Sequence, residues 1–490
     1  MQIRLKNIGI VKDSVISVNG LTVITGKNNS GKTTVGKALY SLLDAVSNIQ
    51  AKARNDRASY ISKSLDDIME IMDGFRFFRY AADHDRRLTE EGNPLSQYPT
   101  LLTFILRNYK LDLSLPELED FAHKLYDELL SLDIEVLAED TIMQNFLRRY
   151  VVRGSEVKGI TDLISKQREK ALSALSELFS TISKDPQLID YTRESISQTL
   201  RVEFANQIQP VSVNVDSSTI ELYNDDSLCF NITIRDNRVV NDGTPVFVSS
   251  PYKKVYLIDN PFVLDNSSTF RRMVRRYTGP DNDSVLDLGR ILTHEEKLRY
   301  TLRRKIQPTV LEQTVINASI EKIKQDIDAI LPGTFEFSSE GEFYIQSGSK
   351  LRISNLATGS KMFSIMKILL EQGELGGSTM LILDEPEAHL HPAWQNLFAE
   401  VIVLLVRELG VNILLTTHSS NFVLALDAYM RKYSIEEKTN FYQTDFLEGG
   451  LIEYICANDN IGAIYQDFLE YLSEVKMLRN ECIRNTGDEK

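Results

Sequence analysis

The chain has few cysteines, and they are not arranged for a metal site or a disulfide framework. Cys229, Cys456 and Cys482 are scattered, odd in number and never in a CxxC spacing. Small secreted domains and zinc sites both rely on regularly spaced cysteines. We therefore expect a reduced, cytoplasmic protein.

Long apolar runs and a basic surplus are absent as well. No run approaches the roughly 20 apolar residues of a membrane span, and the opening MQIRLKNIGIVKDS lacks the basic-then-apolar layout of a signal peptide. The net charge of −14 argues against a surface covered with phosphate-binding residues, although it permits a local basic groove. With 490 residues, of which 42% are hydrophobic and 25% charged, we expect about two to four globular domains and no membrane partner.

The stretch LTVITGKNNSGKTTVGKALYSLL, which starts at Leu21, predicts a phosphate-binding loop. A β-branched strand over 21–25 leads into a glycine loop and an amphipathic helix, and residues 26–33 fit GxxxxGK[ST]. Glycines let backbone N–H groups surround phosphate oxygens, and the helix N-terminus adds its dipole. Lys32 can reach the β- and γ-phosphates, while the hydroxyl of Thr33 can ligate magnesium. A plain turn would match the pattern too, but its context favours ATP binding through Gly26, Asn28, Asn29, Ser30, Gly31, Lys32, Thr33 and Thr34.

Far downstream, MLILDEPEAHLHP (residues 380–392) places two carboxylates at the end of a buried strand. A P-loop ATPase needs a second strand of this kind, with one group for the metal and one for the attacking water. We expect Asp384 to hold Mg²⁺ together with Thr33, and Glu385 to act as the general base. Alone, the run could be a buried strand with an acidic end, but the P-loop upstream favours the catalytic interpretation.

Glu387, His389 and His391 suggest an alternative use of the same segment, because His-x-His beside a carboxylate can bind a transition metal. Pro386 and Pro392 bracket the segment as a turn, and no further histidine or cysteine ligand is evident locally. We therefore favour the magnesium and water roles over a dedicated transition-metal site.

A second buried strand, in VNILLTTHSSNF, ends on His418. A lone histidine is usually structural. This one follows the acidic strand after a single helix, and a parallel sheet would set the two strand ends side by side. We expect His418 to lie beside Glu385 and to face the γ-phosphate, as a third catalytic residue with Glu385 and Lys32.

GKNNSGKT and DEPEAHLHP together resemble the ABC-type ATPase superfamily in its soluble branch. That branch holds the structural-maintenance-of-chromosomes (SMC) proteins, the RecF-type repair ATPases and the overcoming-lysogenization-defect (OLD) ATPases. The match covers the head segments only. It implies an α/β fold, with an ABC-type head whose mixed sheet surrounds the P-loop, carrying two helical insertions.

The superfamily has a signature loop, LSGG[QE], ahead of a helix, and ISNLATGSKMFSIMKILLEQG stands at that place. Residues 356–361 align with LSGGEK, with Ala357 in place of serine and Thr358 in place of glycine. By resemblance, Thr358, Gly359 and Ser360 would contact the γ-phosphate of ATP held by the opposite subunit. This implies a head-to-tail dimer or a higher homo-oligomer.

The glutamine loop of the family has no clear counterpart. The candidate strand lies in KVYLIDNPFVLD, which has Asp259 and Asn260 where glutamine would stand. The contacts to the adenine base are likewise not predicted.

Lys32 and Asp384 are 352 positions apart, far more than one ATPase core requires. The excess predicts helical insertions, of which the first is broken by Gly92, Pro94 and Pro116 and so is not one long coiled coil. The expected order is a head segment with the P-loop at 1–50, a helical insertion at 51–210, head strands at 211–266, an arginine-rich helical insertion at 267–340, a head segment with signature loop, acidic strand and His418 at 341–455, and a C-terminal helix at 456–490.

The second insertion contains FRRMVRRY, which places much of its charge on one side of a helix. Such a face could bind nucleic acid. A solvated helix surface is the commoner explanation in an acidic chain, and we favour it. The four residues concerned are Arg271, Arg272, Arg275 and Arg276.

Only 72 residues follow His418, and they lack the acid-rich nuclease domain that OLD nucleases carry there. We therefore expect an OLD-like or Septu-like ATPase that acts through another protein. Its expected role is the sensor or regulator ATPase of an anti-phage defence system that controls a separate nuclease or toxin. A RecF-like repair ATPase that clamps duplex DNA, and a non-catalytic scaffold locked by ATP, stay open as alternatives.

Overall fold

A computed structural model describes residues 1–72, 94–106, 113–139, 157–183, 187–224, 227–241, 250–265, 292–303, 310–338 and 341–462, with positions 464, 465, 473 and 475–479 beyond them. The chain divides into two compact units. The first, which we call the head, comprises Met1–Ile49, Leu188–Val285 and Arg290–Lys490. The second, the helical unit, comprises Gln50–Gln187 and Leu286–Gly289. All residues predicted for the nucleotide site belong to the head.

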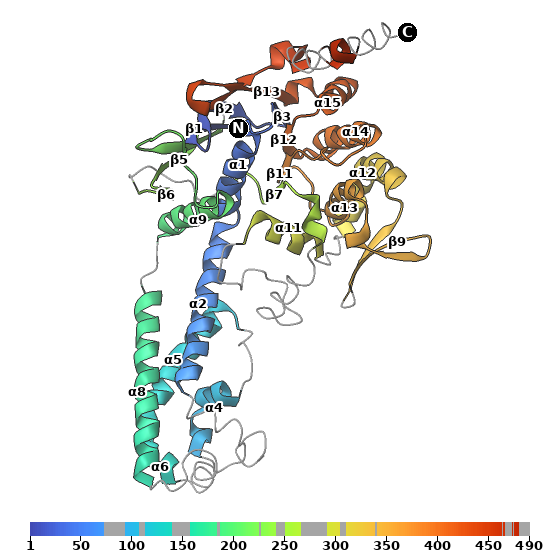
Figure 1. Ribbon diagram of the computed structural model, residues 1–490. Coiled ribbons are helices and arrows are strands. Elements are labelled where there is room, and N and C mark those ends of the chain that lie inside the picture. The colour runs from blue at the N-terminus through green and yellow to red at the C-terminus, as the bar shows by residue number, and fades with distance from the viewer. Residues whose placement is uncertain are drawn as a thin grey trace, which may run out of the picture. The chain divides into compact units, whose positions relative to one another are not determined.

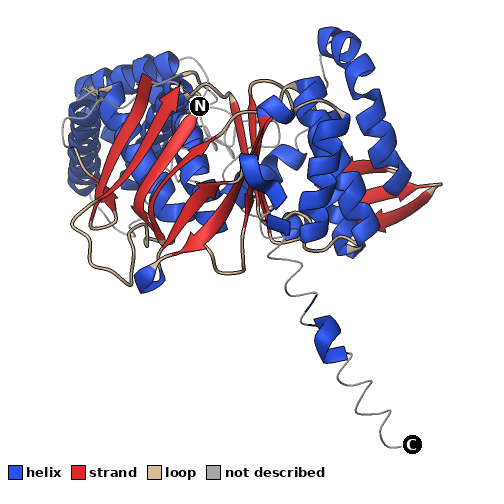
Figure 2. Cartoon of the chain, turned by 90° about the horizontal axis from the view of Figure 1, so that it is seen from above, coloured by secondary structure: helices blue, strands red, loops and turns tan. Residues whose placement is uncertain are grey.

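The head is built on an 11-stranded mixed sheet with the order β6-β5-β4-β1-β2-β14-β13-β3-β12-β11-β7. The strands β13, β3, β12, β11 and β7 run parallel, whereas β1, β2, β4, β5 and β6 form antiparallel pairs. Figure 2 shows these strands in red with helices packed against them. The predicted α/β class with a mixed sheet is thus confirmed. The strand bounds are β1 (Gln2–Ile8), β2 (Val11–Ser17), β3 (Leu21–Thr25), β4 (Ser218–Asn224), β5 (Ser227–Arg235), β6 (Arg238–Val239), β7 (Lys254–Ile258), β11 (Thr379–Asp384), β12 (Asn412–Thr417), β13 (Thr439–Phe446) and β14 (Ile452–Cys456).

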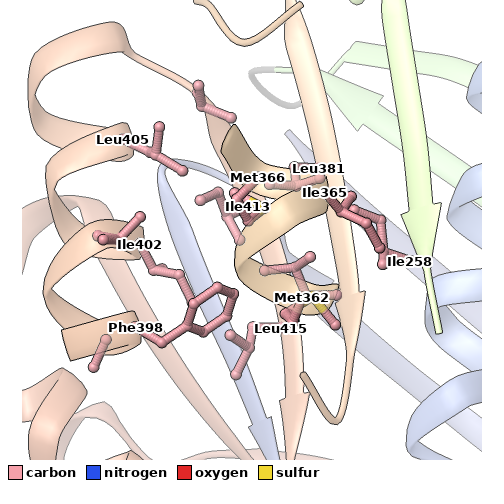
Figure 3. Close-up of a cluster of buried hydrophobic side chains, with 14 of the residues drawn as sticks. Ile258, Met362, Ile365, Met366, Leu381, Phe398, Ile402, Leu405, Ile413 and Leu415 are labelled. Atoms are coloured by element: carbon pink, nitrogen blue, oxygen red, sulfur yellow. The ribbon is translucent and has the colours of Figure 1, made fainter. Parts of the chain in front are cut away.

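The central parallel strands are buried on both faces. β3 reads LTVIT and β11 reads TMLILD, without the alternation of polar and apolar residues that a half-exposed strand shows. Successive residues of β11 instead belong to two apolar cores: Leu381 and Leu383 to one, Met380 and Ile382 to the other. Figure 3 shows part of the first core, with Ile258, Met362, Ile365, Met366, Leu381, Phe398, Ile402, Leu405, Ile413 and Leu415 labelled.

Helices supply the other half of each core. α1 (Lys32–Val46) and α9 (Leu188–Glu203) pack together and belong to the second core, with buried residues such as Leu39, Ile196 and Leu200. The first core takes its helical residues from α11 (His294–Arg303), α12 (Val310–Ile330), α13 (Thr358–Glu371), α14 (Pro392–Leu409) and α15 (Ser420–Lys432). Figure 1 shows α1 and α9 beside one another and α13, α14 and α15 as neighbours.

Two segments that the sequence analysis assigned to insertions belong to the head. α9 falls within the expected insertion 51–210, but the apolar side chains of Ile196 and Leu200 bury it in the head core, so the first segment of the helical unit ends at Gln187. α11 and α12 fall within the expected insertion 267–340, and their buried leucines and isoleucines join the core around β11. A separate three-stranded antiparallel sheet follows, made of β8 (Thr334–Phe337), β9 (Glu342–Gln346) and β10 (Ser349–Arg352).

The helical unit has a core of its own. Its main helices have apolar residues at helical spacing, and Ala122, Leu125, Leu129, Ala171 and Leu175 are fully buried. Ser114 and Glu117 form a capping box that starts one of these helices beside a proline. The elements are α2 (Ile49–Ile71), η2 (Pro94–Gln97), α4 (Pro99–Leu106), α5 (Leu115–Ser131), α6 (Ile134–Glu139) and α8 (Val157–Ile182).

None of the helices in the described part of the chain combines the length and the apolar character that crossing a bilayer requires.

Candidate nucleotide site

The P-loop connects β3 to α1, and its backbone includes positive φ angles that glycine adopts readily. Gly31 has φ of 68° and immediately precedes α1, and Asn29 has φ of 62°, so both occupy the left-handed region. A Cβ atom on Gly26 would collide with Oγ1 of Thr444 on β13. The carbonyl of Gly31 accepts a hydrogen bond from the hydroxyl of Tyr454 at 2.6 Å. β13 and β14 thus hold the loop at both ends.

Lys32 is turned back into this loop. Its Nζ atom donates to the carbonyl oxygens of Gly26 at 3.1 Å and Lys27 at 2.8 Å, and its side chain is only 4% exposed. The same atom lies 3.3 Å from Oε1 of Glu385. The hydroxyl of Ser30 is buried without a hydrogen-bond partner. An orphaned buried hydroxyl beside a lysine fits a loop that contacts phosphate oxygens.

Asp384 and Thr33 form the oxygen pair predicted for magnesium. Oγ1 of Thr33 donates to Oδ2 of Asp384 at 2.6 Å, and the hydroxyl of Thr416 donates to Oδ1. Burial raises the pKa of Asp384, although both hydroxyls favour its ionised form. Hydroxyl and carboxylate oxygens are the ligands that Mg²⁺ takes in proteins. The residues present therefore fit this ion.

Glu385 follows Asp384 with a strained backbone. Its φ is 49°, in the left-handed region that a residue with a side chain seldom adopts. The N–H of Glu385 points to both the carbonyl oxygen and the hydroxyl of Thr416, each at 3.1 Å, and this contact holds the conformation. The strain turns the carboxylate, 33% exposed, toward Lys32 and His418.

His418 stands directly after β12, and β12 pairs in parallel with β11. Its Nδ1 atom lies 3.2 Å from Oε2 of Glu385, at an angle that does not make a hydrogen bond. The structure therefore brings together Lys32, Glu385 and His418 from three neighbouring parallel strands. Each comes from the carboxyl end of its strand or the loop after it, where open α/β sheets bind their ligands.

A further residue of this region, Glu387, received no catalytic role from sequence. It is only 1% exposed, and the hydroxyl of Thr417 donates to its Oε1. The N–H of Ser419 in turn donates to Oγ1 of Thr417 at 3.0 Å. Burial raises the pKa of Glu387. Through Thr417, Glu387 therefore supports both residues that flank His418. This connection depends on the pairing of β11 with β12 and could not be predicted from the sequence.

Glu387, His389 and His391 do not converge as a transition-metal site would require. Glu387 accepts a hydrogen bond from Thr417. Nδ1 of His391 accepts a hydrogen bond from the N–H of Ala393 and so caps α14. The ring of His389 meets the ring of Phe262 edge-on, with the ring centroids 5.9 Å apart. Within the described ranges, the one group of three close enough to share an ion lies elsewhere, at Asp259, His294 and Glu295.

The signature segment forms the start of α13. Gly359 is buried so closely that a Cβ atom would lie 3.0 Å from the carbonyl oxygen of His389. Lys361 donates to Asp265 at 2.7 Å and anchors the segment on η3 (Pro261–Leu264). Thr358 and Ser360 are partly exposed, and Ala357 gives α13 no side-chain cap. The P-loop, in contrast, packs on β13 and β14. Different elements therefore hold the P-loop and the signature segment in place.

Asp259 occupies the position where the glutamine loop was sought. β7 pairs in parallel with β11, with Ile258 opposite Leu383, so Asp259, the residue after β7, lies next to Asp384. The pairing of two strands whose partner residues are 125 positions apart is not visible in the sequence. The arginines predicted to form a basic face, Arg271, Arg272, Arg275 and Arg276, lie outside the described residues.

Comparison with known proteins gives a family and a distant relative. The sequence profile of the family described as "AAA domain, putative AbiEii toxin, Type IV TA system" matches residues 21–425. The "Retron Vc95 probable ATPase" of Vibrio cholerae serotype O1 biovar El Tor is 28% identical over 195 residues. That match covers 36% of this chain, and the chain spans only 36% of the relative's length. The family match extends over more than half of the chain and confirms the predicted ATPase family.

Among solved structures, SMC heads are similar at a low level. The SMC head domain from Thermotoga maritima has a TM-score of 0.33 at 10% identity, over 93% of this chain and 97% of that one. The Smc head from Pyrococcus furiosus with an extended coiled coil has a TM-score of 0.30 at 11% identity, over 97% and 98%. A likeness at this level says nothing about activity or partners.

Proposed function

The chain belongs to the family described as "AAA domain, putative AbiEii toxin, Type IV TA system", and from this premise we propose that it hydrolyses ATP at the carboxyl edge of its parallel sheet. The observation that carries the proposal is the convergence of Lys32, Thr33, Asp384, Glu385 and His418. A lysine, a hydroxyl, two carboxylates and an imidazole are groups that transfer of a phosphoryl group to water uses.

Each of these residues has one role in the proposal. Glu385 accepts the proton of the attacking water, and its partial exposure lets water reach it. Lys32 and His418 balance the negative charge that develops on the γ-phosphate. Thr33 and Asp384 would hold Mg²⁺, which when bound neutralises charge on the phosphate oxygens. The N–H groups of residues 26–34 surround the phosphates.

The proposal includes a second copy of the chain. Thr358, Gly359 and Ser360 start α13 without a side-chain cap. The N–H of Ser360 donates to the carbonyl oxygen of Ala357, and the N–H groups of Thr358 and Gly359 at the helix start suit a phosphate. In a head-to-tail dimer this segment of one copy reaches the nucleotide on the P-loop of the other. ATP closes the dimer, and hydrolysis opens it. This arrangement gives the start of α13, which lacks a side-chain cap, a function.

The biological role that we propose is regulation of a separate effector protein, a nuclease or toxin, in anti-phage defence. Two observations support it: the family is described through a type IV toxin–antitoxin system, and one relative is a retron ATPase. The ATPase would sense the trigger or restrain the effector, and the state of the dimer would transmit the signal.

The test uses full-length Glu385→Gln protein, tagged and purified from its native host with Mg²⁺ and ATP. Removal of the base should trap the ATP-bound dimer, which light scattering would detect as a doubled mass. The double variant Lys32→Ala/Glu385→Gln is the control. It keeps the side-chain amide of Glu385→Gln but loses the ammonium group that we propose binds phosphate. We expect a dimer and a co-purified effector in the first protein only.

Two results would contradict the proposal in different ways. A monomer whose mass does not change with ATP would exclude the head-to-tail dimer. A dimer that carries duplex DNA and no protein would replace the regulatory role by a RecF-like clamp, and that binding should weaken steeply with salt.

A further inference from the structure

His294 is held in one orientation outside the groups assigned to hydrolysis. It is the first residue of α11, and its Nδ1 atom lies 2.5 Å from Oε2 of Glu203, at the end of α9. Its backbone N–H donates to Oε1 of the same carboxylate at 3.1 Å. The ring meets Tyr40 edge-on, with centroids 5.9 Å apart. These contacts leave Nε2 as the nitrogen available to another group.

That nitrogen faces carboxylate oxygens. Nε2 of His294 is buried and has no hydrogen-bond partner, although it lies 3.0 Å from Oδ1 of Asp259. Glu295 completes the group, and one ligand atom from each of the three residues lies within 4.8 Å of the others. The side chain of Asn260 donates to Oε1 of Glu295 at 3.4 Å and steadies it.

The groups around the imidazole carry more negative than positive charge. The carboxylates of Glu203, Asp259 and Glu295 surround it and Lys37 acts on Asp259, so the three acids still outnumber Lys37 and a protonated ring. Lys297, one turn further along α11, is paired with Asp44. A cluster with more negative than positive charge attracts a cation, and burial strengthens that attraction.

We infer that Asp259, His294 and Glu295 form a second divalent-cation site, suited to Zn²⁺ or Mn²⁺ and separate from the magnesium pair Thr33 and Asp384. The ligand set of one imidazole nitrogen and two carboxylates is typical of these ions, whereas Mg²⁺ takes oxygen alone. Ligands at tetrahedral angles around zinc lie about 3.4 Å apart, close to the 3.0 Å between His294 and Asp259.

Glu203 has the supporting role that carboxylates have behind metal-bound histidines. By accepting the hydrogen of Nδ1 it holds the tautomer in which Nε2 carries the lone pair, and it makes the ring a stronger ligand.

The test is titration of the full chain with Zn²⁺ by calorimetry, in the absence of nucleotide. We expect one ion per chain. Asp259→Asn and Glu295→Gln should weaken binding at least about tenfold, and Glu203→Gln by roughly tenfold to hundredfold. Glu295 is partly exposed, so its variant should fold, which thermal melting would verify.

Two controls separate this site from others. Glu296→Gln changes the neighbouring carboxylate, which caps α11 through Thr293, and His389→Ala removes a histidine elsewhere in the head. Both should bind Zn²⁺ as the wild type does. No stoichiometric binding, or binding that Asp259→Asn and Glu295→Gln leave unchanged, would overturn the inference. Because the assay needs neither ATP nor turnover, its failure would leave the proposed hydrolysis untouched.

Discussion

Nζ of Lys32 and Oε1 of Glu385 lie 3.3 Å apart, although 353 positions separate the two residues in the chain. The proposed phosphate-binding cation and the proposed base are therefore electrostatic partners. A γ-phosphate would compete with Glu385 for the ammonium group, and that competition would free the carboxylate to accept a proton. The pairing of β3 with β12, and of β12 with β11, creates this relationship.

Replacement of Lys32 by alanine should weaken ATP binding. A hydrogen bond from a charged group contributes about 1.5–3 kcal/mol, so its loss should raise the Kd roughly tenfold to hundredfold. Calorimetric titration with ATP and Mg²⁺ measures this directly. Lys12→Ala, at an exposed position of β2, is the matched control and should bind normally. Equal affinity of both variants would show that Lys32 does not contact phosphate.

Thr33 should set the magnesium requirement of the ATPase. Thr33→Ala removes the hydroxyl that donates to Asp384, and we expect the Mg²⁺ concentration for half-maximal activity to rise at least about tenfold. Thr33→Ser keeps a hydroxyl at the same place and should restore the wild-type requirement. The measurement is ATPase rate against Mg²⁺ concentration at saturating ATP. A serine variant as impaired as the alanine variant would assign the effect to packing instead.

Glu387 should make stability depend on pH in a defined direction. Burial raises its pKa in the folded chain, so folding favours the protonated form. The stability that protonated Glu387 contributes to the folded chain is therefore complete below the unfolded pKa of about 4.3, and it is lost as pH rises through the folded pKa. Glu387→Gln is neutral at every pH and keeps an oxygen for Thr417. The Tm of this variant relative to that of the wild type should therefore increase as pH rises above about 4.3.

The matched variant for that comparison is Glu387→Ala, which lacks the acceptor for the Thr417 hydroxyl and should be less stable at every pH. A glutamine variant that loses stability relative to the wild type as pH rises would mean that folding lowers the pKa of Glu387, contrary to the direction expected from its burial.

The helical unit should respond separately to a cavity in its core. Leu175 is fully buried, and Leu175→Ala should lower the free energy of unfolding of this unit by about 2–5 kcal/mol. The single tryptophan, Trp394, belongs to the head, so its fluorescence reports the head alone. In urea, the circular dichroism transition should shift while the fluorescence transition stays in place. Glu177→Ala, exposed on the same helix, should shift neither, and a joint shift would show that the two units unfold together.

The parts of the site that could be predicted from sequence are those with local signals. Strand, glycine loop and helix follow one another within residues 21–46, and LILDE and LLTTH each show a buried strand ending on functional groups. Parallel strands that end at one sheet edge then bring such groups together, whatever the loops between them. This is why the proximity of Glu385 to His418 could be anticipated.

Other features depend on contacts that no local pattern reveals. Asp259 lies next to Asp384 only because β7 pairs with β11 across a long insertion, and His294 reaches both Asp259 and Glu203 from a third segment. α9 has the same helical periodicity as the helices of the insertion before it. Its place in the head follows from what its apolar face packs against, not from the spacing of its residues.

The most direct test of the central claim mixes two inactive variants. Lys32→Ala damages the P-loop, and Ala357→Arg places a bulky charge on the exposed residue before α13, where the partner's nucleotide would dock. Each should lack ATPase activity alone, whereas Ser349→Arg, exposed on β10, should retain it. In a mixed dimer one site joins an intact P-loop to an intact signature segment, so an equal mixture should regain up to about a quarter of the wild-type rate. An Ala357→Arg protein that hydrolyses ATP at the wild-type rate, with no gain on mixing, would contradict a site shared between two chains.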